Sequence, residues 1–152
     1  MCVYMKNKPI FLILLFIVPF INLSAQENML EKGEKLFMEN KPVEANPVLT
    51  ASLSQFPDND KTYMMLGIAY SQTLNYEKAV SSFKDGARKA LRDRDLFYYN
   101  AGNIYYLMEQ YPLAEEMYSR AIRENGSRGS LYLNRANARL SMDMKEDAVS
   151  DY

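Results

Sequence analysis

The chain repeats itself at intervals of 34 or 35 residues, and this period constrains its fold more than any other feature. One small-residue position recurs at Gly33, Gly67, Gly102 and Ala136, and a second recurs at Ala45, Ala79, Ala114 and Ala148. Large residues keep the same spacing, at Met29, Tyr63, Tyr98 and Tyr132 and at Leu49, Phe83, Tyr118 and Tyr152. A fixed period of this length is typical of stacked repeat architectures, so four copies of one structural unit are predicted.

Each copy has the pattern of two helices joined by a short turn. In the second copy, Tyr63, Gly67 and Tyr70 share one helical stripe, and Ala79 and Phe83 lie on another. Residues 74–76 separate the two stripes. Because small residues allow two backbones to approach closely, we expect Gly67 to face Ala79 across the helix pair. The large aromatic residues are then expected to fill the space toward the next pair.

This pattern resembles the tetratricopeptide repeat, a helix-turn-helix unit of 34 residues. The resemblance is carried in the second copy by Tyr63, Leu66, Gly67, Tyr70, Ala79 and Phe83, and in the third by Tyr98, Gly102, Tyr105, Ala114, Tyr118 and Ala121. It implies an all-α fold of antiparallel helix-turn-helix repeats stacked in a right-handed superhelix. The expected copies cover about 26–59, 60–94 and 95–128, with an incomplete fourth at 129–152.

The first and fourth copies depart from the family pattern. Pro47 falls inside the second helix of the first copy, where the lost hydrogen bond predicts a kinked or frayed helix. The fourth copy has Ala136 in place of glycine, carries Arg135 and Arg139 on its first helix, and reaches Tyr152 partway through its second. Repeat arrays usually finish with a polar capping helix. We therefore expect either a fragment of a longer protein or a partner that covers this end.

The first 25 residues have the pattern of a secretory signal peptide. Lys6 and Lys8 precede a 12-residue apolar run at 10–21, and Ala25 supplies a small residue at the expected cleavage site. As a helix the run would span about 18 Å, which is short for a membrane core of about 30 Å. Export to the periplasm or the cell exterior is predicted. Two alternatives stay open: an uncleaved membrane anchor formed by residues 10–21, and a buried core helix.

The composition argues against catalysis and against nucleic-acid binding. The chain has no His, and its single Cys, Cys2, would leave with the signal peptide. That removes the Ser-His and Cys-His pairs and the His-bound zinc sites. Lys and Arg together number 18 against 19 acidic residues, so there is no basic excess to neutralise phosphates. We expect no catalytic residues, no cofactor and no metal site, because the Met residues are scattered through the repeats as core or groove fillers.

A binding groove is the functional site that the repeats predict. In the family that the chain resembles, the first helices of the pairs line a concave groove that binds an extended peptide or a partner helix. Asn amides both donate and accept hydrogen bonds, so they can pair with the backbone of a peptide of any sequence. The predicted groove residues are Met64, Ile68, Tyr99, Asn103, Tyr106, Leu133 and Asn137. For Asn100 and Asn134, contacts between neighbouring repeats are an equally good interpretation.

The sequence thus predicts an exported, non-catalytic scaffold that binds another protein or peptide through its groove. Some family members grip a C-terminal carboxylate with cations in the groove. Leu107, Tyr111 and Ser141 stand at the matching positions here, and Lys145 is the only cation near them, so uncharged or mixed ligands are expected. The alternative is a spacer or docking arm of a larger cell-envelope protein truncated at Tyr152. Membrane contact is expected only if the N-terminal segment stays uncleaved, and the sequence leaves the oligomeric state open.

Overall fold

The computed structural model describes residues 29–152, and all of the regular structure in this range is helical. The predicted signal peptide, 1–25, lies outside the described residues. A first helix covers residues 29–38 of the described range. It is followed by α2 (Pro42–Leu53), α3 (Asp60–Gln72), α4 (Tyr76–Lys89), α5 (Arg94–Leu107), α6 (Tyr111–Glu124), α7 (Gly129–Ser141) and α8 (Lys145–Val149).

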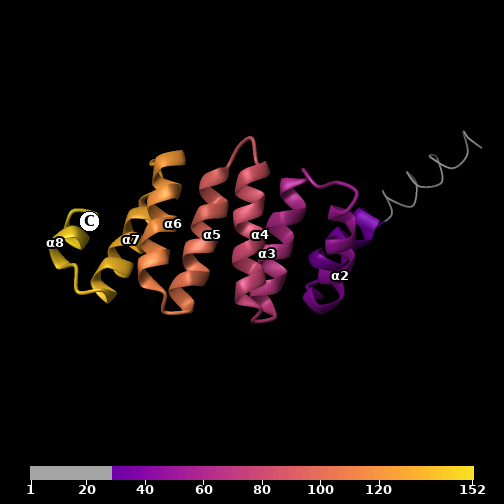
Figure 1. Ribbon diagram of the computed structural model, residues 1–152, viewed down its shortest axis with the longest axis horizontal. Helices are drawn as coiled ribbons and strands as arrows, with labels where there is room; N and C mark the ends of the chain where they lie inside the picture. The colour runs from indigo at the N-terminus through magenta and orange to yellow at the C-terminus, as the bar shows by residue number, and fades with distance from the viewer. Residues whose placement is uncertain (1–28) are drawn as a thin grey trace, which may run out of the picture.

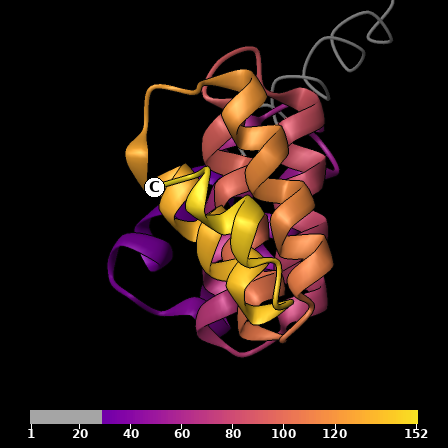
Figure 2. The ribbon, with the colours of Figure 1, turned by 90° about the vertical axis from the view of Figure 1, so that its left-hand side faces the viewer.

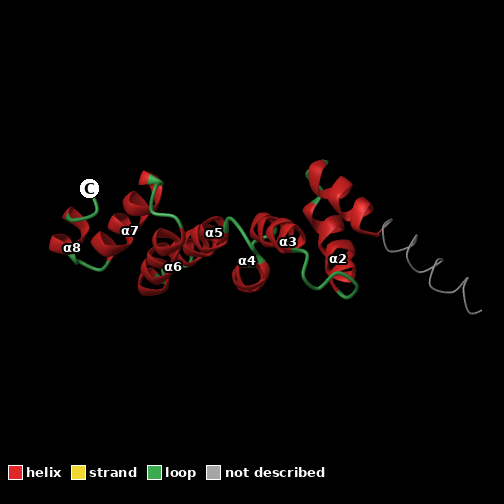
Figure 3. Cartoon of the chain, turned by 90° about the horizontal axis from the view of Figure 1, so that it is seen from above, coloured by secondary structure: helices red, strands yellow, loops and turns green. Residues whose placement is uncertain are grey.

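The helices stack in chain order into an elongated array (Figure 1). Seen from above, α3 and α5 lie on one side of the array and α4 and α6 on the other (Figure 3). The view along the array shows the successive pairs one behind another, with α8 nearest the viewer (Figure 2). Each helix therefore packs mainly against its neighbours in sequence, as a repeat architecture requires. Within the described range, no helix has both the length and the apolar character needed to cross a membrane.

A helix C-cap recurs at the turn inside each of the four copies. The second residue after the first helix adopts a left-handed conformation at Asn40, Leu74, Glu109 and Asp143, with φ between 56° and 61°. In the second copy, the N–H of Leu74 donates to the carbonyl of Ser71 at 3.0 Å, and the N–H of Asn75 donates to that of Tyr70 at 2.9 Å. This pair of bonds is the Schellman motif, which satisfies carbonyls at the end of a helix. Equivalent bonds close the other three turns, so the four copies share one turn geometry.

In the first three copies, the recurring glycine packs against a large side chain of the following helix. A Cβ built on Gly102 would lie 2.6 Å from Cε1 of Tyr118, and one on Gly33 would lie 2.7 Å from Cδ2 of Leu49. At Gly67 the nearest atoms belong to the ring of Phe83, a contact that the sequence did not predict. The space that a glycine leaves empty is filled by the side chain of the following helix.

Proline affects the second helices less than the sequence suggests. Helix α2 continues through Pro47 and ends at Leu53, so the expected fraying does not occur. The carbonyl that loses its partner to Pro47 belongs to Val43, an exposed residue, and water can satisfy it there. Pro42 and Pro112 lie in the first turns of α2 and α6, where a missing N–H costs nothing.

The fourth copy contains a largely buried ion-pair network. Arg135 donates to Asp151, and Arg139 donates to Asp151 at 2.9 Å and to Glu115 at 2.9 Å. The carboxylate of Asp151 is buried, and both guanidinium groups are largely buried beside it. The two arginines on α7 therefore tie α6 to the segment that follows α8.

We predict that Gly67→Ala destabilises the protein by about 1–3 kcal/mol, because the added methyl group overlaps the ring of Phe83. Gly129→Ala is the matched control, since a Cβ at Gly129 meets nothing within 4 Å. Urea unfolding followed by circular dichroism would measure both variants. Equal stabilities for the two would contradict the packing assignment.

A second prediction concerns the left-handed turn. Leu74 is 72% exposed and has a φ of 59°, so Leu74→Gly should remove backbone strain while losing little packing. We expect stabilisation by about 1 kcal/mol. Glu77→Gly, which places the same residue inside α4, should instead cost about 0.5–1 kcal/mol. Thermal unfolding should shift in opposite directions for the two variants, and shifts of the same sign would rule out the turn argument.

Candidate functional site

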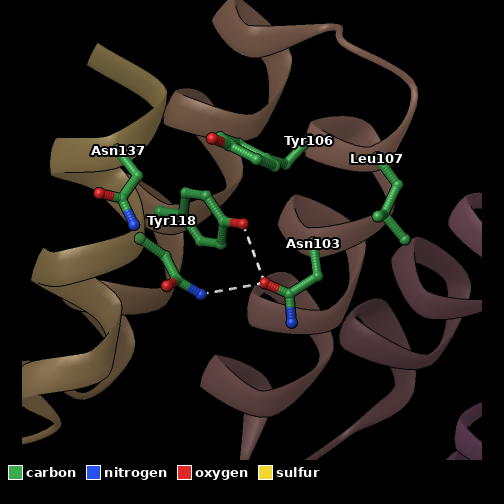
Figure 4. Close-up of a pocket in the computed structure, with 6 residues that line it drawn as sticks. Asn103, Tyr106, Leu107, Tyr118 and Asn137 are labelled. Carbon is green, nitrogen blue, oxygen red and sulfur yellow. Dashed lines mark hydrogen bonds between the residues drawn. The ribbon is translucent and has the colours of Figure 1, made fainter. Parts of the chain in front are cut away.

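A pocket of about 270 Å³ lies among α5, α6 and α7. Its lining residues come from three helices: Asn103, Tyr106 and Leu107 from α5, Tyr118 from α6, and Asn134 and Asn137 from α7 (Figure 4). None of these six side chains is charged. The pocket is therefore an uncharged cavity that combines amide groups with aromatic and aliphatic surface.

The packing of α6 on α5 brings Tyr118 to the floor of this pocket. Gly102 has no side chain, so the Tyr118 ring can lie directly against α5. The side chain of Tyr118 is only 2% exposed, yet its hydroxyl reaches the residue that follows the glycine. Burial raises the pKa of the Tyr118 hydroxyl above its ordinary value, so the group stays protonated and able to donate at neutral pH.

Two hydrogen bonds converge on the side-chain oxygen of Asn103. The Tyr118 hydroxyl donates to Oδ1 of Asn103 at 2.9 Å, and Nδ2 of Asn134 donates to the same oxygen at 3.1 Å. Both lone pairs of this oxygen are therefore occupied. The amide nitrogen of Asn103 points away from Tyr118 (Figure 4) and makes no hydrogen bond to another described side chain. Asn103 thus offers its N–H groups and not its oxygen.

The fourth copy repeats this arrangement. The Tyr152 hydroxyl donates to Oδ1 of Asn137 at 3.3 Å, and the two residues are 15 positions apart, as Asn103 and Tyr118 are. The second copy has Ile68 and Phe83 at the corresponding positions, and neither can form this bond. The amide and the hydroxyl therefore occur together in two copies and are both absent from a third.

Aromatic and aliphatic side chains form the rim of the pocket. The rings of Tyr106 and Tyr111 meet edge to face with their centroids 5.3 Å apart. The Tyr106 hydroxyl lies 3.5 Å from Oγ of Ser141 on α7. Leu107 is 61% exposed next to these groups. The rim thus presents apolar surface beside the free amide donors.

The structure brings together three of the seven predicted groove residues, because Asn103, Tyr106 and Asn137 all line the pocket. The other four lie elsewhere. Ile68 and Met64 are half-buried against the core around α4 and α5, and Tyr99 packs on Tyr118 with the ring centroids 6.3 Å apart. Leu133 is 48% exposed outside the pocket lining.

The two asparagines with an alternative interpretation do contact neighbouring groups. Asn134 joins the fourth copy to the third through its bond to Asn103. Asn100 donates to the carbonyl of Leu96 at 2.8 Å and lies 3.7 Å from the sulfur of Met64 in the second copy. Both asparagines therefore contact a neighbouring repeat, and Asn134 also lines the pocket.

Of the six lining residues, Tyr118 is the one that the sequence did not place in the groove, whereas Leu107 was placed at a groove position and Asn134 had two interpretations. Tyr118 was expected to serve only as a core aromatic residue. The signal that could have found it is the 15-residue spacing from asparagine to tyrosine, which occurs in the third and fourth copies and is replaced by isoleucine and phenylalanine in the second. Within the described range, no three acidic or other metal-binding side chains gather where they could hold a metal ion.

Comparisons with known proteins support the repeat assignment. Residues 60–88 and 97–127 match the family model of the tetratricopeptide repeat. None of the curated proteins matches the chain. Among solved structures, a crystal structure of the MamA protein superposes with a TM-score of 0.77 at 18% identity and covers 86% of this chain and 71% of that chain. A second crystal structure of MamA gives a TM-score of 0.72 at 22% identity, over 79% of this chain and 70% of that one.

A further similar structure is that of YrrB, described as a TPR protein with an unusual peptide-binding site. It has a TM-score of 0.69 at 19% identity and covers 81% of this chain and 63% of that chain. These similarities and the matched segments confirm the predicted fold class. Residues 29–152 form an all-α solenoid of stacked helix pairs that matches solved tetratricopeptide-repeat structures, and segments 60–88 and 97–127 match the repeat itself.

The bond between Tyr118 and Asn103 generates a stability prediction. Asn103→Ala should cost about 1–3 kcal/mol, because it leaves the buried Tyr118 hydroxyl without its acceptor. Adding Tyr118→Phe should recover part of that loss, since the second copy already combines apolar side chains at these positions. A double-mutant cycle by urea unfolding measures the coupling. Additive effects of the two changes would show that the hydrogen bond contributes nothing.

Proposed function

We propose that this protein is an exported, non-catalytic scaffold that binds another protein or peptide through the pocket among α5, α6 and α7. The observation that carries the proposal is the pair of asparagines, Asn103 and Asn137, whose amide nitrogens are free in an uncharged pocket. Such groups bind main-chain carbonyls without regard to the side chains of the ligand. They suit a scaffold that holds an extended segment of a partner.

The size of the pocket supports a short protein segment over a cofactor. About 270 Å³ lies below the range of about 300–1,000 Å³ typical of sites that enclose a small molecule. One apolar side chain resting on Leu107 and Tyr106 would occupy part of it. The neighbouring backbone of the ligand could then reach the two amides. A peptide-binding site in YrrB, a protein of similar fold, agrees with this use of the solenoid.

The charge of the pocket favours an uncharged ligand. None of its lining residues is an arginine or a lysine, so a carboxylate would lose its water without gaining an ion pair. A ligand that presents neutral carbonyl groups avoids this cost. The proposal of export rests on the pattern of residues 1–25 alone. If the pocket binds nothing, the spacer or docking arm of a larger envelope protein becomes the better account.

The test uses peptides selected on the full chain from a random 12-residue library displayed on phage. In the double variant Asn103→Asp with Asn137→Asp, each side chain keeps the oxygen that accepts the tyrosine hydroxyl and loses the amide donor. We expect the affinity for the selected peptides to fall about 10-fold, because two donor contacts are lost. Fluorescence anisotropy of labelled peptides would measure it.

The matched control is Asn75→Asp with Asn125→Asp. It makes the same change of charge at two asparagines outside the pocket lining. We expect the control to bind like the original protein. Equal losses in the two double variants would reduce the effect to charge and would overturn the pocket as the binding site. Unchanged binding in both would do the same.

A further inference from the structure

We propose that Tyr118 is a positioning residue that holds the Asn103 amide by its oxygen and leaves its N–H groups free for a ligand, so that the pocket selects an uncharged hydrogen-bond acceptor such as a peptide carbonyl. This inference rests on the proposed function and names the chemical group that the pocket recognises. It depends on one property of the asparagine side chain. The amide can present either its oxygen or its nitrogen to a ligand, so some neighbouring group must decide which end faces outward.

The buried hydroxyl of Tyr118 determines the orientation of the Asn103 amide. A hydroxyl proton removed from water needs an acceptor, and leaving it without one is costly. Among the hydrogen bonds of the described residues, the only acceptor for this proton is Oδ1 of Asn103, at 2.9 Å. Rotating the amide by half a turn would place an N–H group against the hydroxyl and leave the hydroxyl proton unpaired. With the oxygen inward, the hydroxyl proton of Tyr118 and the amide nitrogen of Asn134 both have an acceptor.

The second copy can be compared with the third and fourth, which carry the asparagine and the tyrosine. Where a copy has asparagine at the pocket position, it has tyrosine 15 residues later, as in Asn103 with Tyr118 and Asn137 with Tyr152. Where a copy has isoleucine at that position, as at Ile68, it has phenylalanine. The ring fills the same space above a glycine at Phe83 and Tyr118, so packing alone does not require the hydroxyl. The hydroxyl appears where there is an amide to orient.

The pocket therefore has more free hydrogen-bond donors than free acceptors on its asparagine side chains. Among the described residues the amide nitrogens of Asn103 and Asn137 make no hydrogen bond, whereas both of their oxygens accept from tyrosine hydroxyls. Asn134 contributes an amide oxygen, since its own nitrogen is used in the bond to Asn103. A neutral carbonyl satisfies the donors without the desolvation cost of a carboxylate. Leu107 and Tyr106 give an adjacent apolar side chain a surface to pack on.

The experiment uses N-acetyl-leucine N-methylamide as the probe, because it combines two neutral carbonyls with one apolar side chain. Binding to the full chain is followed by two-dimensional ¹H–¹⁵N NMR, which also records the side-chain amide of Asn103. In the original protein we expect a slowly exchanging Tyr118 hydroxyl proton in contact with Asn103, and saturable shifts of the Asn103 amide. N-acetyl-leucine, whose carboxylate is charged, should bind at least about threefold more weakly.

Tyr118→Phe should abolish the hydroxyl signal and weaken binding of the neutral probe about three- to tenfold. It should also narrow the preference for the neutral probe over the charged one. The control Tyr105→Phe removes a hydroxyl from the same helix pair at a residue that does not line the pocket, and it should leave both affinities unchanged. A purely structural role for Tyr118 would lower stability and leave the preference between the two probes intact, which would overturn the inference.

The outcomes separate this inference from the proposed function. If Asn103→Asp weakens binding of the probe and Tyr118→Phe does not, the pocket stands and the positioning role fails. If neither variant changes binding, or if the probe does not bind, both fail. Should Tyr118→Phe not fold, the pair can be transferred to the second copy by Ile68→Asn with Phe83→Tyr. That transfer should create a second slowly exchanging hydroxyl proton in contact with an asparagine amide, and its absence would refute the pairing.

Discussion

The contact on which the rest of this structure depends is the one between a glycine and the large side chain of the following helix. Gly33, Gly67 and Gly102 each leave space for one such side chain, and that space sets how closely the two helices of a pair approach. In the third copy the same contact places the Tyr118 hydroxyl beside Asn103. The chemistry of the pocket is thus a consequence of the packing of the repeat, because a wider helix pair would separate the hydroxyl from its acceptor.

The sequence predicted the architecture well because period is a global property. The spacing predicted four copies, the apolar stripes predicted two helices per copy, and the family resemblance implied an all-α solenoid; all three are present in the described residues. The spacing does not show which side chains are in contact. The contact of Gly67 with Phe83 was therefore not predicted. The turn at 74–76 was predicted, but its left-handed conformation was not, because that position is held by Asn40, Leu74, Glu109 and Asp143 and never by glycine.

The site was only partly predictable for a related reason. Asn103, Tyr106 and Asn137 could be placed together because they recur at equivalent or adjacent positions of neighbouring copies. The roles of Tyr118 and Asn134 depend on distances across three helices, which a linear pattern does not contain. Met64 and Ile68 are on the second copy, one repeat away from the pocket, and their side chains pack against the core. The predicted groove residues extend over three copies, whereas the pocket lies among the helices of the third and fourth copies.

The second copy is one residue longer than the first and the third. Glycine or alanine at the first small position is followed by alanine 12 residues later in every copy. The extra residue of the second copy falls between Ala79 and Gly102, and α5 has 14 residues where α3 and α7 have 13. In the linker before α5, Leu91 is 93% exposed and Asp93 adopts a left-handed conformation. The extra residue therefore lies outside the 12-residue interval that joins the two helices of a pair. A solenoid built this way can vary the joint between two modules, and so the pitch of the whole array, without redesigning either module.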